Sequence, residues 1–187
     1  MSKRIAAFLL ALVMGVLPMA ASAAQKPVLD PENTIFLDLP AGRVVIQLRP
    51  DLAPGHVARI KELVRQGFYD GLVFHRVIPG FMAQTGDPTG TGSGGTGKKL
   101  KAEFSDAPFV RGTVGMARAG DPNSADSQFF ICFDDASFLN GKYTVFGEVV
   151  SGMENVDKIK MGSQADNGHV DDPTKIVHMR VAADVKN

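Results

Sequence analysis

The sequence has no excess of charge of either sign and almost no cysteine. Its 187 residues include 20 Lys or Arg and 20 Asp or Glu, so the formal net charge is zero. This balance gives no electrostatic basis for binding a nucleic acid or an anionic membrane surface. The single cysteine, Cys132, cannot form an intramolecular disulfide, and its place in the apolar run FFICF predicts a buried thiol rather than a catalytic one. The length, with 44% hydrophobic and 21% charged residues, predicts one globular domain.

Motifs for metal, nucleotide and hydrolytic chemistry are also missing. The histidines are not spaced as a metal-binding pair, and the sequence contains no G-x-S-x-G motif. The segment GSGGTGKK, residues 92–99, differs by one position from a nucleotide-binding P-loop, because Lys99 stands where a Ser or Thr would bind magnesium. The glycine-rich stretch 86–97 is therefore predicted to be an exposed loop, and we expect neither a metal nor a cofactor.

The one long apolar run lies at the N-terminus. Lys3 and Arg4 precede apolar residues 5–17, which are too few to span a bilayer comfortably. Ala21-Ser22-Ala23 then fits the small-residue rule for signal-peptide cleavage. This pattern predicts a cleaved signal peptide at residues 1–23, with cleavage one residue later, before Gln25, as a variant and an uncleaved membrane anchor as the alternative.

The mature chain is predicted to be exported and to have no further membrane segment. Residues 24–32 are polar and contain proline, which is typical of a short lead-in. Residues 33–187 show no internal repeat and no linker, so we assign them to one domain.

Most of this domain has the period-two alternation of β-strands. Residues 35–39 and 44–48 alternate around a short turn at Pro40-Ala41-Gly42, which predicts a hairpin. Helical spacing predicts one helix that begins near Pro54 and ends near Gly67, and a second, short helix that begins near Met153. Further strands are predicted at residues 110–117, 127–133, 143–150 and 177–181. Many short strands with one early and one late helix favour an antiparallel barrel capped by helices.

The stretch VFHRVIPGFMAQTGD, residues 73–87, places one cation among large apolar side chains. Alternation predicts strands at 73–78 and 81–85, joined by the turn dipeptide Pro79-Gly80. If the strands pair, Arg76, Phe81 and Gln84 share one surface, which suits an uncharged ligand that is part ring and part peptide backbone. On the same alternation, His75 points away from that surface and is structural. The alternative is a core hairpin with a surface arginine.

Two segments of the sequence resemble the cyclophilin family of peptidyl-prolyl isomerases. FHRVIPGFMAQTGD is similar to the signature of that family, and residues 112–159, GTVGMARAG to NVDKI, are similar to its other characteristic half in the same order. The similarity extends from about Asn33 to the C-terminus. It implies a closed, eight-stranded antiparallel β-barrel capped by two α-helices, and an isomerase that rotates X–Pro peptide bonds without a metal or a cofactor.

The resemblance also implies roles for individual residues. Arg76 would donate toward the proline nitrogen, and Gln84 would bind the substrate backbone; together with Phe81 they are the implied catalytic residues. The implied substrate-binding residues are Met82, Ala117, Arg118, Ala119, Gln128, Phe130, Phe138, Leu139 and Tyr143. Within FFICF, alternation places Phe130 opposite in direction to Phe129 and Ile131, so that a pocket residue lies between two core residues.

Three positions depart from the pattern of many family members. Arg118 replaces an asparagine, Phe138 a tryptophan and Tyr143 a histidine. Because the contact at Arg118 is implied to be with the main chain, we expect little effect on activity there. Phe138 and Tyr143 lie at the implied pocket rim, which favours at most weak binding of cyclosporin.

These features together are similar to a bacterial exported cyclophilin. The resemblance implies a periplasmic location, with secretion as the alternative, and proline-containing unfolded or exported polypeptides as partners; we expect a monomer. A second hypothesis is a binding module or chaperone that grips proline segments and has little isomerase activity. Arg76 distinguishes the two hypotheses, because binding alone would not require it.

Overall fold

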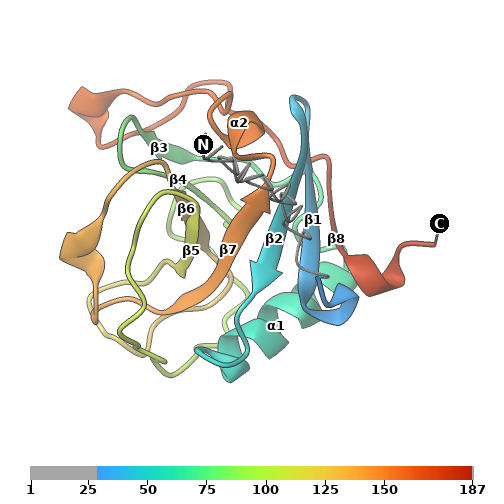
Figure 1. Cartoon of the computed structure of the whole chain (residues 1–187). Coiled ribbons are helices and arrows are strands. Elements are labelled where there is room, and N and C mark those ends of the chain that lie inside the picture. The colour runs from blue at the N-terminus through green and yellow to red at the C-terminus, as the bar shows by residue number, and fades with distance from the viewer. Residues whose placement is uncertain (1–28, 187) are drawn as a thin grey trace, which may run out of the picture.

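The computed structural model describes residues 29–186, and one antiparallel sheet dominates it (Figure 1). The predicted signal peptide, residues 1–23, lies outside the described residues. The strands are β1 (Thr34–Leu39), β2 (Gly42–Leu48), β3 (Arg76–Ile78), β4 (Met82–Thr85), β5 (Thr113–Met116), β6 (Phe129–Cys132), β7 (Val145–Ser151) and β8 (His178–Val181). Their order across the curled sheet is β3-β4-β6-β5-β7-β2-β1-β8.

The sheet is curled but its two ends are not paired. β3 and β8 stand at the two ends of the strand order, and within residues 29–186 no ladder joins them. The segments ahead of these strands meet at a single bridge between Val73 and Lys175. The closed barrel implied by the family resemblance is therefore not confirmed, whereas eight antiparallel strands with two helices are.

Several strands are shorter than the alternation predicts. The strand predicted at 73–78 pairs with β4 only at Arg76–Ile78. Ahead of it, Phe74 donates its N–H to the carbonyl of Thr174, outside any strand. The strand predicted at 110–117 is likewise reduced to Thr113–Met116. Apolar side chains outside a paired strand can be buried as well, so an apolar run in the sequence can extend beyond the strand itself.

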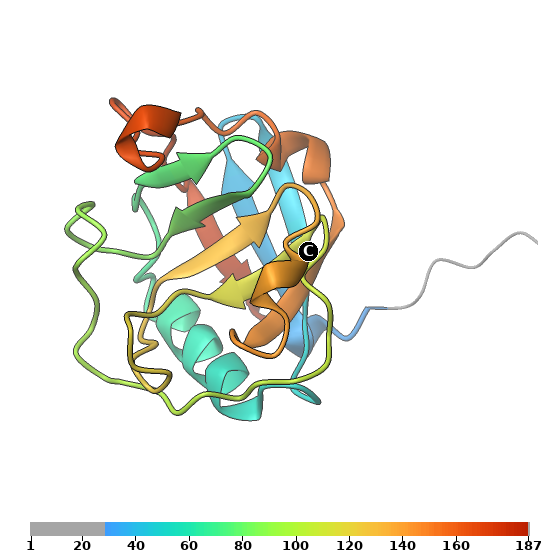
Figure 2. The same ribbon diagram turned by 90° about the vertical axis from the view of Figure 1, so that its left-hand side faces the viewer.

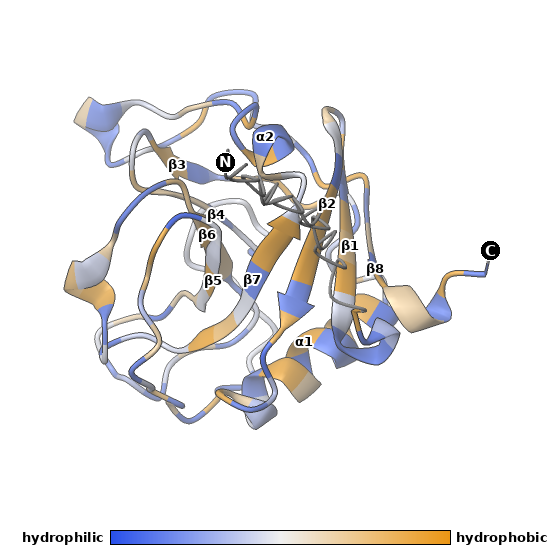
Figure 3. Cartoon of the chain, in the orientation of Figure 1, coloured by the Kyte–Doolittle hydropathy of each residue, from blue (hydrophilic) through white to orange (hydrophobic). Residues whose placement is uncertain are grey.

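The strands separate two apolar clusters. The larger cluster is the core between the sheet and helix α1 (Pro54–Arg65), and it contains Phe129 and Ile131 of β6. The smaller cluster lies on the other face of β6 and contains Phe130. The alternation predicted within FFICF is thus confirmed. Figure 3 shows hydrophobic stretches of β2 and β7 interrupted by hydrophilic residues.

The helices lie toward opposite ends of the curled sheet (Figures 1 and 2). Pro54 is the first residue of α1, as predicted, and the helix buries Val57, Ile60, Leu63 and Val64. Helix α2 (Met153–Val156) is a single turn. Four 3-10 turns complete the elements: η1 (Pro31–Asn33), η2 (Ser137–Leu139), η3 (Gln164–Asp166) and η4 (Ala182–Asp184). Within residues 29–186 no helix is long and apolar enough to cross a membrane.

The glycine-rich loop is organised around two buried carboxylates. Asp87, whose exposed fraction is 1%, accepts the N–H groups of Thr89, Gly92 and Gly94 at distances of 2.6–3.0 Å. Asp126 similarly accepts the N–H groups of Thr96 and Gly97. The donors that would cradle a phosphate in a P-loop thus bind the protein's own carboxylates.

The Asp87 carboxylate stabilises the fold only while it is ionised. Burial raises its pKa, but the bonds from Gly94, Thr89 and Gly92 together outweigh burial and hold the pKa at about 2. Because this value lies below the unfolded value of about 3.9, the stabilisation is complete above about pH 4 and is lost as the pH falls through about 2.

We expect Asp87→Asn to lower the free energy of unfolding at pH 7 by about 2 kcal/mol, since the new amide would point N–H groups at the N–H groups of the loop. Urea unfolding at pH 7 and at pH 2.5 measures this. The loss should be smaller at pH 2.5, where the wild-type carboxyl is also partly protonated. The control Asp171→Asn changes a fully exposed carboxylate, and an equal effect there would contradict the interpretation.

Candidate functional site

The hairpin formed by β3 and β4 brings the predicted polar residues together. Arg76 lies directly opposite Gln84 in the register of the two strands. The turn between them requires glycine at Gly80, where φ is +70°, and it is closed by a bond from the N–H of Phe81 to the carbonyl of Ile78. Because Val77 and Ala83 are buried in the main core, Arg76 and Gln84 point to the opposite face. The shared surface predicted for Arg76, Phe81 and Gln84 is confirmed.

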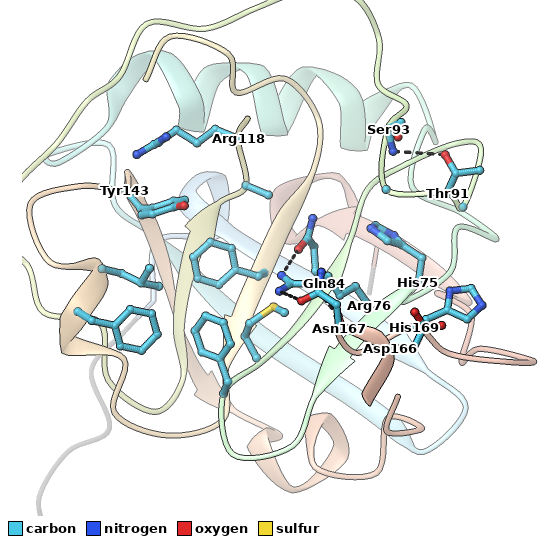
Figure 4. A pocket seen from close by; sticks show the side chains of 18 residues that line it. His75, Arg76, Gln84, Thr91, Ser93, Arg118, Tyr143, Asp166, Asn167 and His169 are labelled. Carbon is cyan, nitrogen blue, oxygen red and sulfur yellow. Dashed lines mark hydrogen bonds between the residues drawn. The ribbon is translucent and has the colours of Figure 1, made fainter. Parts of the chain in front are cut away.

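These residues line a cavity of about 590 Å³ (Figure 4). Ten of the twelve predicted site residues line it: Arg76, Phe81, Met82, Gln84, Ala117, Arg118, Phe130, Phe138, Leu139 and Tyr143. The other two, Ala119 and Gln128, line a neighbouring cavity of about 370 Å³, which shares Gln84, Ala117 and Arg118 with the first. The predicted residues therefore form one continuous surface that covers two adjoining cavities.

The apolar part of the larger cavity has a buried floor and an exposed rim. Met82, Phe130 and Leu139 are at most 7% exposed, and the Phe130 ring stacks on Phe109 with centroids 5.7 Å apart. At the rim, Phe138 is 60% exposed and its ring lies 5.2 Å from that of Phe81. The floor is fixed by packing, so this part of the cavity is already formed and suits a small apolar ring.

Arg76 is held by neutral oxygens rather than by a carboxylate. Its Nη1 donates to Oε1 of Gln84 at 3.1 Å, and Nε and Nη2 donate to the carbonyl oxygen and Oδ1 of Asn167 at 3.0 and 2.9 Å. Among the arginines of residues 29–186, Arg43, Arg49, Arg59, Arg65, Arg111 and Arg180 all pair with a carboxylate, whereas Arg76 and Arg118 do not. Burial lowers the pKa of Arg76 from its ordinary value, but a guanidinium still stays protonated at neutral pH.

The amide of Gln84 connects Arg76 to the glycine-rich loop through hydrogen bonds. Its Nε2 donates to Oε1 of Gln128 at 2.8 Å. Nε2 of Gln128 in turn donates to the carbonyls of Gly92 and Gly94 at 3.0 and 2.8 Å. The chain of bonds fixes which way both amides face, because each amide oxygen accepts and each amide nitrogen donates. The orientation of Arg76 is thus tied to a loop that Asp87 itself holds.

Arg118 forms the opposite wall of the cavity. Its guanidinium lies 4.4 Å from the ring centroid of Tyr143, and it donates to the carbonyls of Lys142, Ala119 and Gly120. The sequence implied only a main-chain contact at this position. The side chain joins the two loops that flank the cavity, and its stacking is of the cation–π kind.

Other residues of the cavity were missed in the sequence. Asp166, Asn167 and His169 line it from the loop that contains η3, far along the chain from β3 (Figure 4). The dipeptide Asn167-Gly168 was a turn signal but gave no sign of contact with Arg76. His75 also lines this cavity, contrary to the prediction, because β3 begins at Arg76 and strand alternation does not extend to His75.

The cavity offers binding and hydrogen-bond donation rather than metal chemistry. Within residues 29–186 no group of three His, Cys, Asp or Glu side chains is placed to hold a metal ion. Cys132 is buried as predicted, and burial raises the pKa of its thiol to about 12, so it is an inert packing residue. What remains is an apolar recess bordered by the Gln84 amide and by two arginines, Arg76 and Arg118, that pair with no carboxylate of residues 29–186.

Comparison with known protein families identifies relatives of the whole domain. The family model described as "Cyclophilin type peptidyl-prolyl cis-trans isomerase/CLD" matches residues 34–181. A probable peptidyl-prolyl cis-trans isomerase of Brucella suis is 56% identical over 193 residues, covering 97% of this chain and 95% of that protein. Peptidyl-prolyl cis-trans isomerase B of Bacillus subtilis is 45% identical over 129 residues, covering 68% of this chain and 90% of that protein.

Solved structures give the same result. A cyclophilin from Hirschia baltica, AquaCyp293, superposes with a TM-score of 0.75 at 28% identity, covering 84% of this chain and 77% of that one. A cyclophilin-type isomerase from Cryptosporidium parvum, crystallised in the presence of the dipeptide Ala-Pro, superposes with a TM-score of 0.74 at 29% identity. This second match covers 82% of this chain and 99% of that one.

The close packing beneath the cavity leaves no room for a methyl group at Gly115. A Cβ atom on Gly115 would lie 2.5 Å from Cε1 of Phe109 and 2.7 Å from Cζ of Phe130. We expect Gly115→Ala to displace the Phe130 ring and to cost about 1–3 kcal/mol of stability. Urea unfolding and the NMR shifts of the Phe130 ring protons measure both effects. Gly120→Ala, where nothing lies within 4 Å, is the control, and unchanged Phe130 shifts in Gly115→Ala would contradict the expectation.

Proposed function

This chain belongs to the cyclophilin family and is a peptidyl-prolyl cis-trans isomerase, and we propose that Arg76 is the group that lowers its rotational barrier. The observation that carries this proposal is that Arg76 lies beside a preformed apolar recess and pairs with no carboxylate of residues 29–186. A cation that is positioned but not neutralised can act on a neutral substrate.

The reaction is a rotation, so the enzyme needs no nucleophile. The X–Pro bond resists rotation because the nitrogen shares its lone pair with the carbonyl, and the barrier is about 18–20 kcal/mol. In the twisted state the nitrogen is pyramidal and its lone pair can accept a hydrogen bond. Each tenfold acceleration requires about 1.4 kcal/mol of preferential binding to that state.

The apolar recess would hold the proline ring while the preceding carbonyl rotates. Met82, Phe130 and Leu139 supply its buried floor, and Phe81 contributes from the rim. A fixed ring leaves the other end of the amide as the moving part. Binding of the ring favours ground and twisted states equally, so the recess by itself supplies affinity but no acceleration.

Arg76 would supply the difference between the two states. Three of the five N–H groups of a guanidinium are engaged by Gln84 and Asn167, and two remain to donate. A donor directed at the proline nitrogen stabilises the twisted amide and offers little to the planar one. Because the acceptors are neutral, the positive charge is not compensated within the site, and the bond to substrate is charge-assisted.

The remaining predicted residues would bind the substrate backbone. Gln84 has its amide oriented by Gln128 and Arg76 and borders the recess. The main chain of Ala117, Arg118 and Ala119 lies along the strip between the two cavities, where it can pair with the residues ahead of proline. Main-chain recognition predicts broad tolerance of the residues around the proline.

We expect the mature protein to accelerate cis/trans exchange in an Ala-Pro peptide and Arg76→Ala to lose about two orders of magnitude of that acceleration, since a transition-state donor is removed. NMR exchange spectroscopy measures the rate, and peptide titration measures affinity. Arg43→Ala, which removes an arginine paired with Asp38 elsewhere on the sheet, should leave the rate unchanged.

The alternative of a proline-binding module with little isomerase activity has a different outcome. It would appear as normal peptide binding by both the native protein and Arg76→Ala, with exchange accelerated by neither. Loss of binding together with rate in Arg76→Ala would instead make Arg76 a binding residue.

We further propose that the enzyme is exported and assists the folding of exported proteins, most simply as a monomer in a periplasm. Support comes from the sequence alone: Lys3 and Arg4, the apolar run 5–17 and the Ala21-Ser22-Ala23 site. Phe138 and Tyr143 at the rim of the cavity support weak rather than tight cyclosporin binding.

Expression of the full chain in a Gram-negative host tests the export proposal. The protein should be recovered from the periplasmic fraction with Ala24 or Gln25 as its first residue, as intact mass reports. A chain without residues 1–23 is the control and should stay in the cytoplasm. Full-length protein in the membrane fraction would favour the uncleaved anchor, and processed protein in the medium would favour secretion.

A further inference from the structure

We propose that Asn167 is a positioning residue that holds Arg76 in its reactive orientation with neutral oxygens, and thereby leaves its charge available to the substrate. This inference rests on the role proposed for Arg76. Asn167 supplies two of the three oxygens that bind the guanidinium, the main-chain carbonyl and Oδ1. Figure 4 shows Asn167 beside Arg76 and Gln84, at the edge of the recess.

The segment that carries Asn167 is a closed turn. The N–H of Gly168 donates to the carbonyl of Ser163 at 2.8 Å, and the N–H of Ser163 donates to the carbonyl of His169 at 2.9 Å. Inside this turn, the N–H of His169 donates to the carbonyl of Asp166, also at 2.9 Å. The turn therefore has a defined shape that does not depend on Arg76.

The same turn is fixed to the outer edge of β3. The N–H of Val77 donates to the carbonyl of Gly168 at 2.8 Å, and the N–H of Gly162 donates to the carbonyl of Val77 at 2.9 Å. Figure 2 shows the turn, near the red end of the colour scale, above the green strands β3 and β4. Gly168 allows this approach, because a Cβ there would lie 2.5 Å from Cγ1 of Ile78. Asn167 is thus placed relative to the strand that bears Arg76.

The backbone of Asn167 is adapted to this task. Its φ of 48° and ψ of 32° lie in the left-handed region, which asparagine tolerates better than most residues with a side chain. Glycine would fit that backbone more easily, but glycine has no Oδ1. The side-chain amide bonds to the guanidinium, which indicates why a side chain is present at a position where glycine costs less strain.

The acceptors matter as much for their lack of charge as for their position. Asp166, the adjacent residue, also lines the cavity but makes no ion pair with Arg76 in the described structure. A carboxylate in place of Oδ1 would hold the guanidinium at least as firmly but would compensate its charge. An amide therefore supplies orientation without neutralisation.

The test compares Asn167→Gly with the wild type in the Ala-Pro exchange assay. Glycine keeps the left-handed backbone and the main-chain acceptor and removes only Oδ1. We expect the enzymatic exchange rate to fall about tenfold, with the peptide dissociation constant within twofold of wild type. In NMR spectra the Arg76 Nε–H should exchange with solvent several-fold faster: its main-chain acceptor remains, but without the bond from Nη2 to Oδ1 the guanidinium can swing away from that acceptor. Gln164→Ala, on the exposed part of the same turn, is the control and should change neither quantity.

A second variant, Asn167→Asp, separates orientation from charge. We expect its Arg76 Nε–H to exchange as slowly as in wild type while the rate still falls severalfold. A wild-type rate in Asn167→Asp would overturn the claim that neutral acceptors matter. Wild-type values of both the rate and the Nε–H exchange in Asn167→Gly would overturn the positioning role, as would a loss of peptide affinity equal to the loss of rate.

The proposed function and this inference fail in different ways. If the wild-type protein does not accelerate exchange, the role proposed for Arg76 is wrong whatever the variants do. The Nε–H measurement needs no activity, so it still decides whether Asn167 restrains the guanidinium.

Discussion

The pairing of Arg76 with Gln84 across the β3–β4 hairpin is the contact on which the rest of the site depends. It places a cation and an amide on the face opposite the main core, beside the recess floored by Met82 and Phe130. Gln84 then orients Gln128, and Gln128 binds the glycine-rich loop. A short hairpin thus orients the amides of Gln84 and Gln128 as well as the guanidinium of Arg76.

The arginines of residues 29–186 form two groups, those that pair with a carboxylate and those that do not, and the second group lines the cavity. Arg43, Arg65, Arg111 and others pair with carboxylates at the surface, where such pairs contribute little stability. Within the described part of the chain, Arg76 and Arg118 instead contact only carbonyl and amide oxygens and an aromatic face. Both line the cavity. Burial of an uncompensated cation is unfavourable in general, and here it is offset by three hydrogen bonds to Arg76 and by partial exposure to solvent.

The sequence predicted those parts of the structure that local patterns determine. Alternation around Pro79-Gly80 was enough to place Arg76, Phe81 and Gln84 on one surface, and the family resemblance supplied Leu139 and Tyr143, which lie far along the chain. The contribution of Asn167 was not predictable, because it depends on how a turn docks on the edge of β3, and no local pattern encodes docking. His75 was misplaced for a related reason: the strand ends where its backbone partners end, which only the tertiary structure reveals. The expectation of a closed barrel was not confirmed for the same reason, since pairing between β3 and β8 depends on long-range contacts.

The turn that carries Asn167 also covers the outer edge of β3, which stands at one end of the sheet. An uncovered edge strand presents free N–H and C=O groups to other chains and is a site for intermolecular strand pairing. The bonds of Val77 to Gly162 and Gly168 occupy those groups. Residues 162–169 therefore have two roles. They cover the edge of β3 against pairing with another chain, and they hold the guanidinium of Arg76. A substitution that loosened this turn would affect solubility as well as rate, and this leaves the segment less free to vary than an exposed loop of its length would otherwise be.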